Sequence, residues 1–240
     1  MIDHNAPRLF VTADLPGAIA FDGGQTNYLK NVMRLAPGSA IKVFNGRDGE
    51  FAARIETLAT RGGSAVAEER LRAQTPAPTV TLAFAPLRQA RLDYMMEKAA
   101  EMGAGRVIPV LTQHGQVRRI NKERVRAHMI EACEQCGTLS VPQITDPVPL
   151  ATLLGECAPG SLVIADEALA GDTRDAVAAI ASATPPLTVL VGPEGGFSPT
   201  ERALFGPRAI AISLGPRILR ADTAAVALLA LVEAAHGSVS

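Results

Sequence analysis

A glycine-rich segment stands directly after an apolar run in the second half of the chain. The segment reads Val191-Gly-Pro-Glu-Gly-Gly-Phe-Ser-Pro-Thr-Glu201, and the apolar run covers residues 187–191. Glycines remove side chains where a strand ends, and open α/β sheets bind ligands at the carboxyl ends of their strands. The stretch from Ser198 to Glu201 resembles a capping box with proline at the first helical position. The segment predicts a ligand loop, although a tight strand-to-helix turn would need the same glycines.

A second loop of similar design follows the next apolar run. It reads Leu214-Gly-Pro-Arg-Ile-Leu-Arg-Ala-Asp-Thr-Ala224, and it opens a helix for which Asp222 or Thr223 is the expected N-cap. Two glycine loops at one sheet edge can enclose a small ligand with backbone groups. Arg217 and Arg220 stand three residues apart, so both can face an anion. The alternative for these two arginines is an ordinary solvated surface.

The nucleotide and nucleophile motifs of other α/β enzymes are missing from the sequence. The pattern G-x-x-x-x-G-K-[ST], which cradles phosphates, does not occur. No G-x-G-x-x-G follows the first strand of the larger part, and no G-x-S-x-G nucleophile elbow is present. A nucleotide hydrolase, a dinucleotide dehydrogenase and a serine hydrolase therefore lose their usual support.

Cysteine usage and hydropathy exclude two further classes of protein. Cys133 and Cys136 form a single C-x-x-C and Cys157 stands apart, whereas a structural zinc takes about four ligands. We therefore expect no metal and interpret these thiols as small hydrophobic side chains on a helix. The longest apolar run, residues 224–232, is shorter than the roughly 20 residues of a membrane span. Because residues 1–10 hold no apolar signal core, we expect a cytoplasmic protein without a membrane segment.

Charge excludes a global attraction to nucleic acid but allows a local one. The chain has 23 Lys and Arg residues against 24 Asp and Glu residues, a net charge of -1. Residues 106–126 nevertheless hold six basic residues against Glu123 alone, with Arg118 and Arg119 near the centre. Such a run predicts phosphate contacts, with a solvated face as the alternative. A second expected group of phosphate contacts comprises Arg8, Lys30 and Arg34.

Composition divides the chain into two domains, residues 1–72 and 80–240. Between them, residues 73–79 hold two prolines among small residues, which disfavour helix and remove strand donors. The first domain carries short β-like runs and one helical pattern, which predicts a small β-barrel of a kind that holds RNA. The second alternates apolar runs with helical patterns. This alternation predicts an α/β domain whose mostly parallel sheet is covered on both faces.

Periodicity and turn signals predict the individual elements. In the first domain we expect strands at 8–12, 40–44 and 51–57, a hairpin turn at 45–49 and a helix at 25–35. In the second domain the expected strands are residues 80–84, 106–111, 161–165, 187–191 and 209–214. The expected helices of that domain are residues 92–102, 122–136, 174–183 and 222–235.

The two glycine loops together resemble one known family. Gly192-Pro-Glu-Gly-Gly-Phe197, followed by the segment from Leu214 to Ala224, resembles the SPOUT methyltransferases. Within them it is most similar to the ribosomal RNA small subunit methyltransferase E family. Arg8-Leu-Phe-Val11 and Glu131-Ala-Cys-Glu-Gln-Cys-Gly137 resemble further motifs of that family. The resemblance covers nearly the whole chain.

The resemblance implies a fold, an activity and a set of site residues. The fold would be a PUA-like β-barrel followed by a SPOUT domain with a deep trefoil knot, an exception to the rule that chains do not thread loops. S-adenosylmethionine would bind in the knot, and the enzyme would methylate N3 of the uridine at position 1498 of 16S ribosomal RNA in the small ribosomal subunit. By position, the cofactor pocket would be formed by Val191, Gly192, Glu194, Gly195, Gly196, Leu214, Gly215, Ile218 and Leu219.

A homodimer is also expected. The resemblance implies one, and the last expected helix points the same way because it is apolar nearly all round. A single sheet covers only one side of such a helix, so a partner subunit would be the second cover.

Methylation at N3 sets a chemical requirement for the site. Uracil N3 carries a proton and is a good nucleophile only after losing it, so a proton acceptor, a stabilising cation or both are needed. Arg217 and Arg220 are the candidate cations, with Arg220 favoured as the catalytic residue, and Glu194 and Asp222 are the candidate acceptors. The sequence leaves the acceptor open. It also leaves open a SPOUT methyltransferase for another RNA and a non-catalytic dimeric RNA-binding protein.

The chain departs from the family pattern at three places. Family members commonly have arginine near Gln113-His114 and at Thr138, and neither arginine is present here. We therefore do not count these positions among the expected RNA contacts. Where many members have glutamate before the final threonine, this chain has Asp222, which keeps the negative charge.

Overall fold

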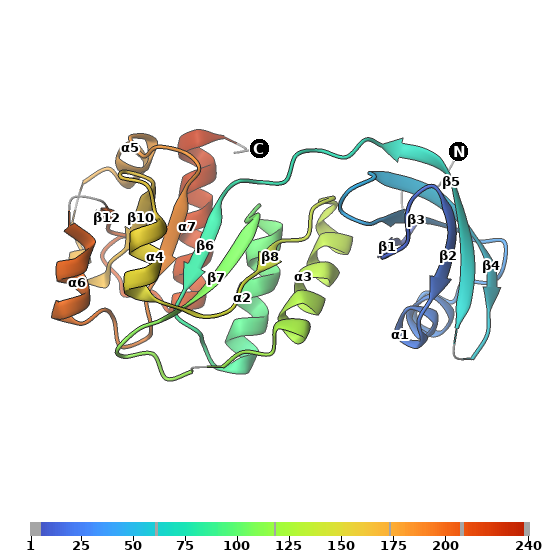
Figure 1. Cartoon of the computed structure of the whole chain (residues 1–240), viewed down its shortest axis with the longest axis horizontal. Helices are drawn as coiled ribbons and strands as arrows, with labels where there is room; N and C mark the ends of the chain where they lie inside the picture. The colour runs from blue at the N-terminus through green and yellow to red at the C-terminus, as the bar shows by residue number, and fades with distance from the viewer. Residues whose placement is uncertain (1–5, 61, 118, 173, 207–208, 238–240) are drawn as a thin grey trace. The chain divides into compact units, whose positions relative to one another are not determined.

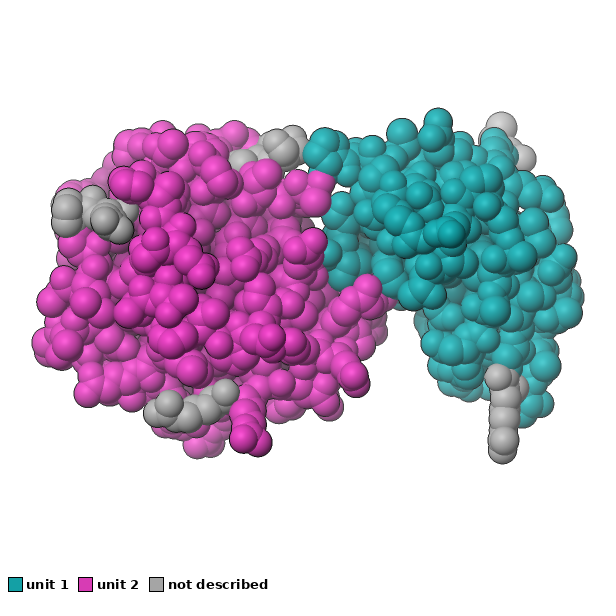
Figure 2. All heavy atoms as spheres, in the orientation of Figure 1, with its two compact units in different colours: residues 1–76, 133–141 teal, residues 77–132, 142–240 magenta. Residues whose placement is uncertain are grey.

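The chain folds into two compact units, which are coloured separately in Figure 2. Unit 1 comprises residues 1–76 and 133–141, and unit 2 comprises residues 77–132 and 142–240. Residues 73–80, around the expected linker, form neither helix nor strand. The computed structural model describes residues 6–60, 62–117, 119–172, 174–206 and 209–237.

Unit 1 is built on a curled sheet of five strands (Figure 1), in the order β1-β3-β4-β5-β2. Among the described residues of this unit, β1 and β3 pair in parallel and the other strand pairs are antiparallel. The strands are β1 (Arg8–Phe10), β2 (Gly17–Phe21), β3 (Ala40–Phe44), β4 (Glu50–Leu58) and β5 (Gly63–Arg72). Alternate side chains, such as Ile41 and Val43, are buried in one core, as the pleat of a half-buried strand requires. The predicted small β domain is confirmed.

A short helical segment connects β2 to β3 in unit 1. Helix α1 (Gly23–Asn27) begins at Asp22, which forms a reciprocal capping box with Gln25. The π-helix η1 (Tyr28–Val32) continues it, and Arg34 leaves it with a φ of 55°. The helix predicted at 25–35 therefore starts and ends earlier than expected. The capping pair at Asp22 and Gln25 was present in the sequence as a start signal.

Unit 2 contains a sheet with the strand order β12-β10-β11-β6-β7-β8, in which β9 also pairs with β7. Every pair is parallel. The strands are β6 (Thr81–Phe84), β7 (Arg106–Leu111), β8 (Gln143–Ile144), β9 (Val148–Pro149), β10 (Leu162–Ala165), β11 (Thr188–Val191) and β12 (Ala209–Ile212). The central strands are buried on both faces, which explains their continuous apolar runs. The predicted parallel sheet is confirmed.

Helices cover both faces of the unit 2 sheet (Figure 1). On one face α7 (Ala221–His236) packs against α2 (Gln89–Glu101), α5 (Ala176–Ala181) and β11. On the other face α4 (Leu150–Glu156) packs against α6 (Pro199–Phe205). Helix α3 (Lys122–Cys136) begins in unit 2, and its last turn belongs to unit 1. The sequence did not predict α4, which is only seven residues long.

The environment of α7 removes one argument for a homodimer. Ala224, Leu228 and Val232 of this helix are buried within the chain. Helices α2 and α5 pack against α7. They therefore cover the side of α7 that a partner subunit was expected to cover. The homodimer therefore stays a prediction of the resemblance alone. In the described part of the chain, no helix is long and apolar enough to cross a membrane.

Candidate functional site

Three loops meet at one edge of the unit 2 sheet. Because β12, β10 and β11 are parallel neighbours, the loops at their carboxyl ends lie side by side. The described parts of these loops that lie nearest to the strand ends are residues 166–172, 192–198 and 213–220. Between them and the first turn of α7 lies a cavity with roughly 560 Å³ of empty space, part of it open to solvent. We refer to it as the first cavity.

The first cavity brings together most of the residues that the sequence predicted for a cofactor pocket. Of the residues predicted for the cofactor or for catalysis, Gly195, Arg220 and Asp222 do not line it. The predicted residues that do line it are Val191, Gly192, Glu194, Gly196, Leu214, Gly215, Arg217, Ile218 and Leu219.

The glycines of the first cavity are required for different reasons. Gly196 has a φ of +67° and Gly215 a φ of +106°, conformations that residues with a Cβ rarely adopt. A Cβ on Gly196 would also overlap the carboxylate of Glu167. A Cβ on Gly192 would come within 2.8 Å of the Phe197 ring. Gly196 and Gly215 therefore set the course of their loops, whereas Gly192 allows Phe197 to pack.

The loop after β10 adds an acidic wall that the sequence analysis missed. Asp166, which is 8% exposed, and Glu167 both line the first cavity. Arg202 of α6 lies 2.9 Å from Asp166 Oδ1 and 2.5 Å from Glu167 Oε1. Its hydrogen bond with Asp166 raises the pKa of Arg202 above its ordinary value. The signal was available, because Asp166 directly follows the apolar run 161–165 at the same sheet edge.

Arg217 and Arg220 differ in their positions. Both are exposed, but Arg217 lines the first cavity, whereas Arg220 is the N-cap residue of α7. The predicted N-cap at Asp222 or Thr223 is wrong, because the helix begins before them and Asp222 lies in its first turn. A carboxylate there interacts favourably with the helix dipole without being the cap, which explains the misplacement.

Arg91 of α2 links the two candidate proton acceptors. Its Nη1 lies 3.2 Å from Asp222 Oδ2, and its Nε lies 3.9 Å from Glu194 Oε1. The Asp222 side chain is 13% exposed and that of Glu194 is 55% exposed. Asp222 is thus a braced carboxylate, and Glu194 is the accessible one. Nothing in the sequence marks Arg91, which stands 131 residues before Asp222.

The chain matches known proteins along both units. A family model for an RNA methyltransferase domain matches residues 74–233, and one for an RNA methyltransferase PUA domain matches residues 21–64. The ribosomal RNA small subunit methyltransferase E of Rickettsia conorii is 33% identical over 208 residues, 86% of this chain and 85% of that protein. The chain belongs to the ribosomal RNA small subunit methyltransferase E family. The resemblance read from the glycine loops is confirmed.

Other relatives agree with this assignment to the methyltransferase E family. The family member from Mycobacterium bovis is 31% identical over 243 residues, 93% of this chain and 90% of that protein. A Legionella pneumophila methyltransferase crystallised with the bound cofactor S-adenosylmethionine has a TM-score of 0.83 at 29% identity, covering 96% of this chain and 98% of that chain. The Neisseria gonorrhoeae methyltransferase E, bound to S-adenosylmethionine, has a TM-score of 0.81 at 24% identity, with the same coverage, and shows the same fold.

Arg8, one of the predicted RNA contacts of this methyltransferase E family member, is largely buried in unit 1. Its side chain is 11% exposed, and Nε donates to Glu50 at 2.6 Å. Its Nη atoms donate to the carbonyl oxygens of Cys133, Glu134 and Thr138 at 2.5 to 3.0 Å. The geometry therefore gives Arg8 a structural role, which is to hold residues 133–141 against the small sheet.

The other predicted RNA contacts are exposed or lie outside the described residues. Lys30 and Arg34 are exposed in η1 and just after it. Arg119 is exposed before α3, and Arg118 lies outside the described residues. Exposed cations of this kind can reach phosphate oxygens, so these positions stay predictions.

Cys133 of the C-x-x-C pair is not a reactive thiol. Burial raises the pKa of the Cys133 thiol to about 12, so this thiol stays protonated at neutral pH. Cys133 is buried and Cys136 is exposed on the same helix. Among the residues that the structure describes, no three His, Cys, Asp or Glu side chains are placed to hold a metal ion.

Proposed function

We propose that this family member transfers a methyl group from S-adenosylmethionine to N3 of a uridine in 16S ribosomal RNA, namely the uridine at position 1498. The observation that carries the proposal is the first cavity, in which glycine backbone, an acidic wall and the exposed Arg217 meet. Relatives named as small subunit ribosomal RNA methyltransferases support the substrate class. The reaction would take place in the cytoplasm.

The lining of the first cavity suits S-adenosylmethionine. That molecule carries a sulfonium and an ammonium group against one carboxylate, so its net charge is positive. Asp166, Glu167 and Glu194 line the cavity, and Arg202 and Arg217 balance only part of their charge. Apolar side chains of the loop after β12 offer a surface for the adenine ring. When bound, the cofactor supplies a methyl group on a positively charged sulfur.

The exposed arginines of the same loop are proposed to act on the RNA base. A uracil that has lost its N3 proton is an anion, and guanidinium groups can hold its carbonyl oxygens. Arg220 is the proposed catalytic residue. It stands at the N-terminus of α7, where the helix dipole also favours an anion. Arg217 would assist from the cavity wall, and Glu194 is the accessible carboxylate beside the reacting base.

The remaining partners are proposed from exposed charge and from the family. Lys30 and Arg34 on unit 1, and Arg118 and Arg119 on unit 2, would contact phosphates of the RNA. A homodimer is proposed on the family resemblance, and light scattering at micromolar concentration tests it. A monomer mass would contradict the dimer.

Calorimetry and methyl transfer together test the proposed function. Titration with S-adenosylmethionine should show one site per chain, and labelled methyl should pass to small ribosomal subunits that lack the modification. Transfer only to a different RNA would favour the alternative substrate. Cofactor binding without transfer to any RNA would favour a non-catalytic RNA-binding protein.

A further inference from the structure

A second hollow opens beside the first cavity in unit 2. Its walls come from the loops after β11, β6 and β7, which are neighbouring strands of the sheet. It contains roughly 330 Å³ of empty space, part of it open to solvent, and Arg88, His114 and Gln116 are among its lining residues. Pro193 and Glu194 line both the hollow and the first cavity. A molecule in the second hollow is therefore adjacent to a molecule in the first cavity.

The ring of His114 has a defined tautomer. Its Nδ1 lies 3.1 Å from the carbonyl oxygen of Gly195 and 2.9 Å from that of Gly196. Carbonyl oxygens only accept hydrogen bonds, so Nδ1 must carry the hydrogen and donate it. In the neutral ring, Nε2 is then an unprotonated acceptor. No hydrogen bond or ion pair to Nε2 is present among the residues that the structure describes.

The His114 loop is anchored from two sides. Glu201, which is 8% exposed, accepts the backbone N–H of Gln113 at 2.7 Å and that of Ser198 at 2.9 Å. On the other side, a Cβ on Gly195 would come within 3.2 Å of the His114 Cβ. Glycine at position 195 thus permits the close approach of His114, rather than lining the first cavity. Both restraints pre-organise the imidazole.

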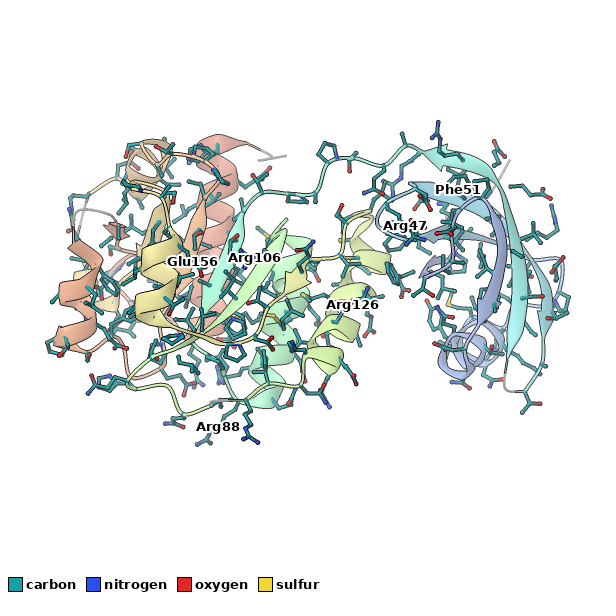
Figure 3. The ribbon with its side chains drawn as sticks, viewed as in Figure 1. Arg47, Phe51, Arg88, Arg106, Arg126 and Glu156 are labelled. Carbon is teal, nitrogen blue, oxygen red and sulfur yellow. The ribbon has the colours of Figure 1, made fainter. Side chains whose placement is uncertain are left out.

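The chemical groups around His114 match one edge of uracil. That edge presents two carbonyl oxygens that accept hydrogen bonds, with the N3–H donor between them. The hollow offers the reverse pattern. Arg88 donates from its guanidinium, and Gln116 keeps a donating amide because its Oε1 already accepts from Arg88 Nη2 at 3.3 Å. His114 Nε2 supplies the acceptor. Arg88 lies at the lower edge of unit 2 in Figure 3.

The geometry points to the second hollow as the site of the target uracil and to Nε2 of His114 as the acceptor of its N3 proton; this inference rests on the proposed function. The N3–H bond breaks, its electron pair stays on N3, and the proton moves to Nε2 to give an imidazolium. The base then turns N3 from Nε2 toward the adjoining first cavity, where the freed pair on N3 forms the bond to the methyl carbon and the sulfur keeps the pair of its broken bond. The imidazolium then releases its proton to water.

The same acceptor excludes cytosine. Cytosine carries a lone pair at N3 instead of a hydrogen. That lone pair would face the lone pair of His114 Nε2, so Nε2 would have no hydrogen-bond donor. His114 is exposed in the free protein, so the penalty arises on binding, when the bound base covers Nε2 and leaves it without a donor. His114 is therefore both a catalytic residue and a specificity-determining one. Glu194, which lines the same hollow, is the competing proton acceptor.

Three variants of the full-length protein separate these roles. His114→Asn keeps an amide near the Nδ1 position, so it preserves the contact with the loop carbonyls but removes Nε2. His114→Gln places an amide near the Nε2 position, where its oxygen can accept a hydrogen bond but cannot take a proton. Gln113→Ala, at the exposed neighbouring residue, is the matched control. Glu194→Gln tests the competing acceptor.

The binding readout uses S-adenosylhomocysteine, so that no methyl transfer takes place. Wild type and Gln113→Ala should bind small ribosomal subunits with uridine at the target position about 10-fold more tightly than subunits with cytidine there. His114→Gln should keep this preference, and His114→Asn should lose it. An equal preference in His114→Asn and wild type would overturn the assignment of the hollow.

The kinetic readout is single-turnover methyl transfer at saturating cofactor. His114→Asn and His114→Gln should each be slowed about 10²-fold or more, the usual contribution of a general base. A 5-fluorouridine target, whose N3–H is more acidic, should recover at least 10-fold of that loss. A rate within 3-fold of wild type, or an equal loss on both targets, would overturn the role of His114. If 5-fluorouridine restores the methyl-transfer rate of Glu194→Gln but not that of the His114 variants, Glu194 is the proton acceptor.

Failure of the inference differs from failure of the proposed function. If wild type forms N3-methyluridine but the His114 variants behave like wild type, only the inference fails. If wild type forms no N3-methyluridine, the proposed function fails first. Cofactor affinity and melting temperature of the two His114 variants should equal those of wild type, and a drop in both would reassign His114 to a purely structural role.

Discussion

The first cavity and the second hollow lie side by side in unit 2 but are built in different ways. The first cavity is formed by loops after β10, β11 and β12, and Gly192, Gly196 and Gly215 are among its lining residues. The second hollow has the polar residues Arg88, His114 and Gln116 in its lining. Backbone groups can bind a cofactor in any sequence that lets the loop adopt the required conformation. The choice between RNA bases depends on the side chains that contact the base. This difference accords with the proposal that the first cavity binds the cofactor and the second hollow selects the substrate base.

The largest expected effect is on cofactor binding in the first cavity. Gly196→Val should reduce S-adenosylmethionine affinity about 100-fold or more, because a Cβ would overlap the Glu167 carboxylate and the φ of +67° is strained for valine. Calorimetry measures this loss. Gly103→Val is the matched control, since Gly103 has a φ of +77° with no atom within 4 Å of a Cβ. If the Gly196 variant folds and binds the cofactor normally, the cofactor is not in the first cavity.

Arg220 should affect the reaction and leave the cofactor in place. Arg220→Ala is expected to lose about 10²-fold in single-turnover rate, the usual cost of removing one group that stabilises a developing anion. Its cofactor affinity should stay unchanged because Arg220 does not line the first cavity. Lysine should be a poor substitute, since it lacks the planar pair of donors. A lower melting temperature and weaker cofactor binding, with a normal rate, would instead show that Arg220 braces the loop.

Glu50 of unit 1 provides a contrast. Its replacement should lower the free energy of unfolding but leave the first cavity and the second hollow unchanged. Burial alone would raise the pKa of Glu50, but hydrogen bonds from Arg72 and Arg8 hold it below its ordinary value of 4.5. Glu50→Gln leaves Arg8 without its ionic partner, so unit 1 should lose about 3 kcal/mol of unfolding free energy near pH 7. Denaturant unfolding measures this difference.

The pH dependence of that difference has a definite sign. A carboxyl whose pKa is lower in the folded state stabilises the fold above its unfolded pKa, and this contribution is lost as pH falls through the folded pKa. The gap between wild type and Glu50→Gln should therefore be constant above about pH 5. It should narrow as the pH falls below 4.5. A gap that widens in acid would contradict the arrangement of Arg8, Glu50 and Arg72.

The smallest expected effect concerns RNA outside both sites. Arg119→Glu should weaken binding of small ribosomal subunits several-fold and flatten its salt dependence by about one counterion, because one phosphate contact is lost. Cofactor affinity should be unaffected. Arg174→Glu, at an exposed arginine paired with Asp172, is the matched control. Equal losses of RNA and cofactor affinity would indicate a folding defect.

The contrast between the two sites also explains what the sequence could predict. The first cavity follows apolar strands, so its glycine loops and Arg217 were found from local pattern. The second hollow joins residues about 110 positions apart across three loops, and no local spacing marks His114 or Arg88 as neighbours of Glu194. Asp166 was missed although the rule that predicted the glycine loops applied to it as well. The trefoil knot stays a prediction of the resemblance.

Two strands of unit 1 were not predicted, because their amino-acid composition is not typical of strands. Strand β5 has a charged second half, Glu68-Glu69-Arg70, whose side chains are exposed, so it does not read as a strand. Strand β2 is five residues of small and apolar type after a proline, which resembles a turn. The buried strands β6, β10 and β11 were predicted because burial on both faces makes them continuously apolar.

The central claim is that the two adjacent sites together methylate N3 of one uridine. The most direct test incubates small ribosomal subunits that lack the modification with the protein and isotopically labelled S-adenosylmethionine. The 16S ribosomal RNA is then digested, and its nucleosides are resolved by mass spectrometry. The expected result is one labelled N3-methyluridine per subunit, at position 1498, and none with the Gly196→Val variant. Label on a ribose, on a cytidine or on several uridines would contradict it.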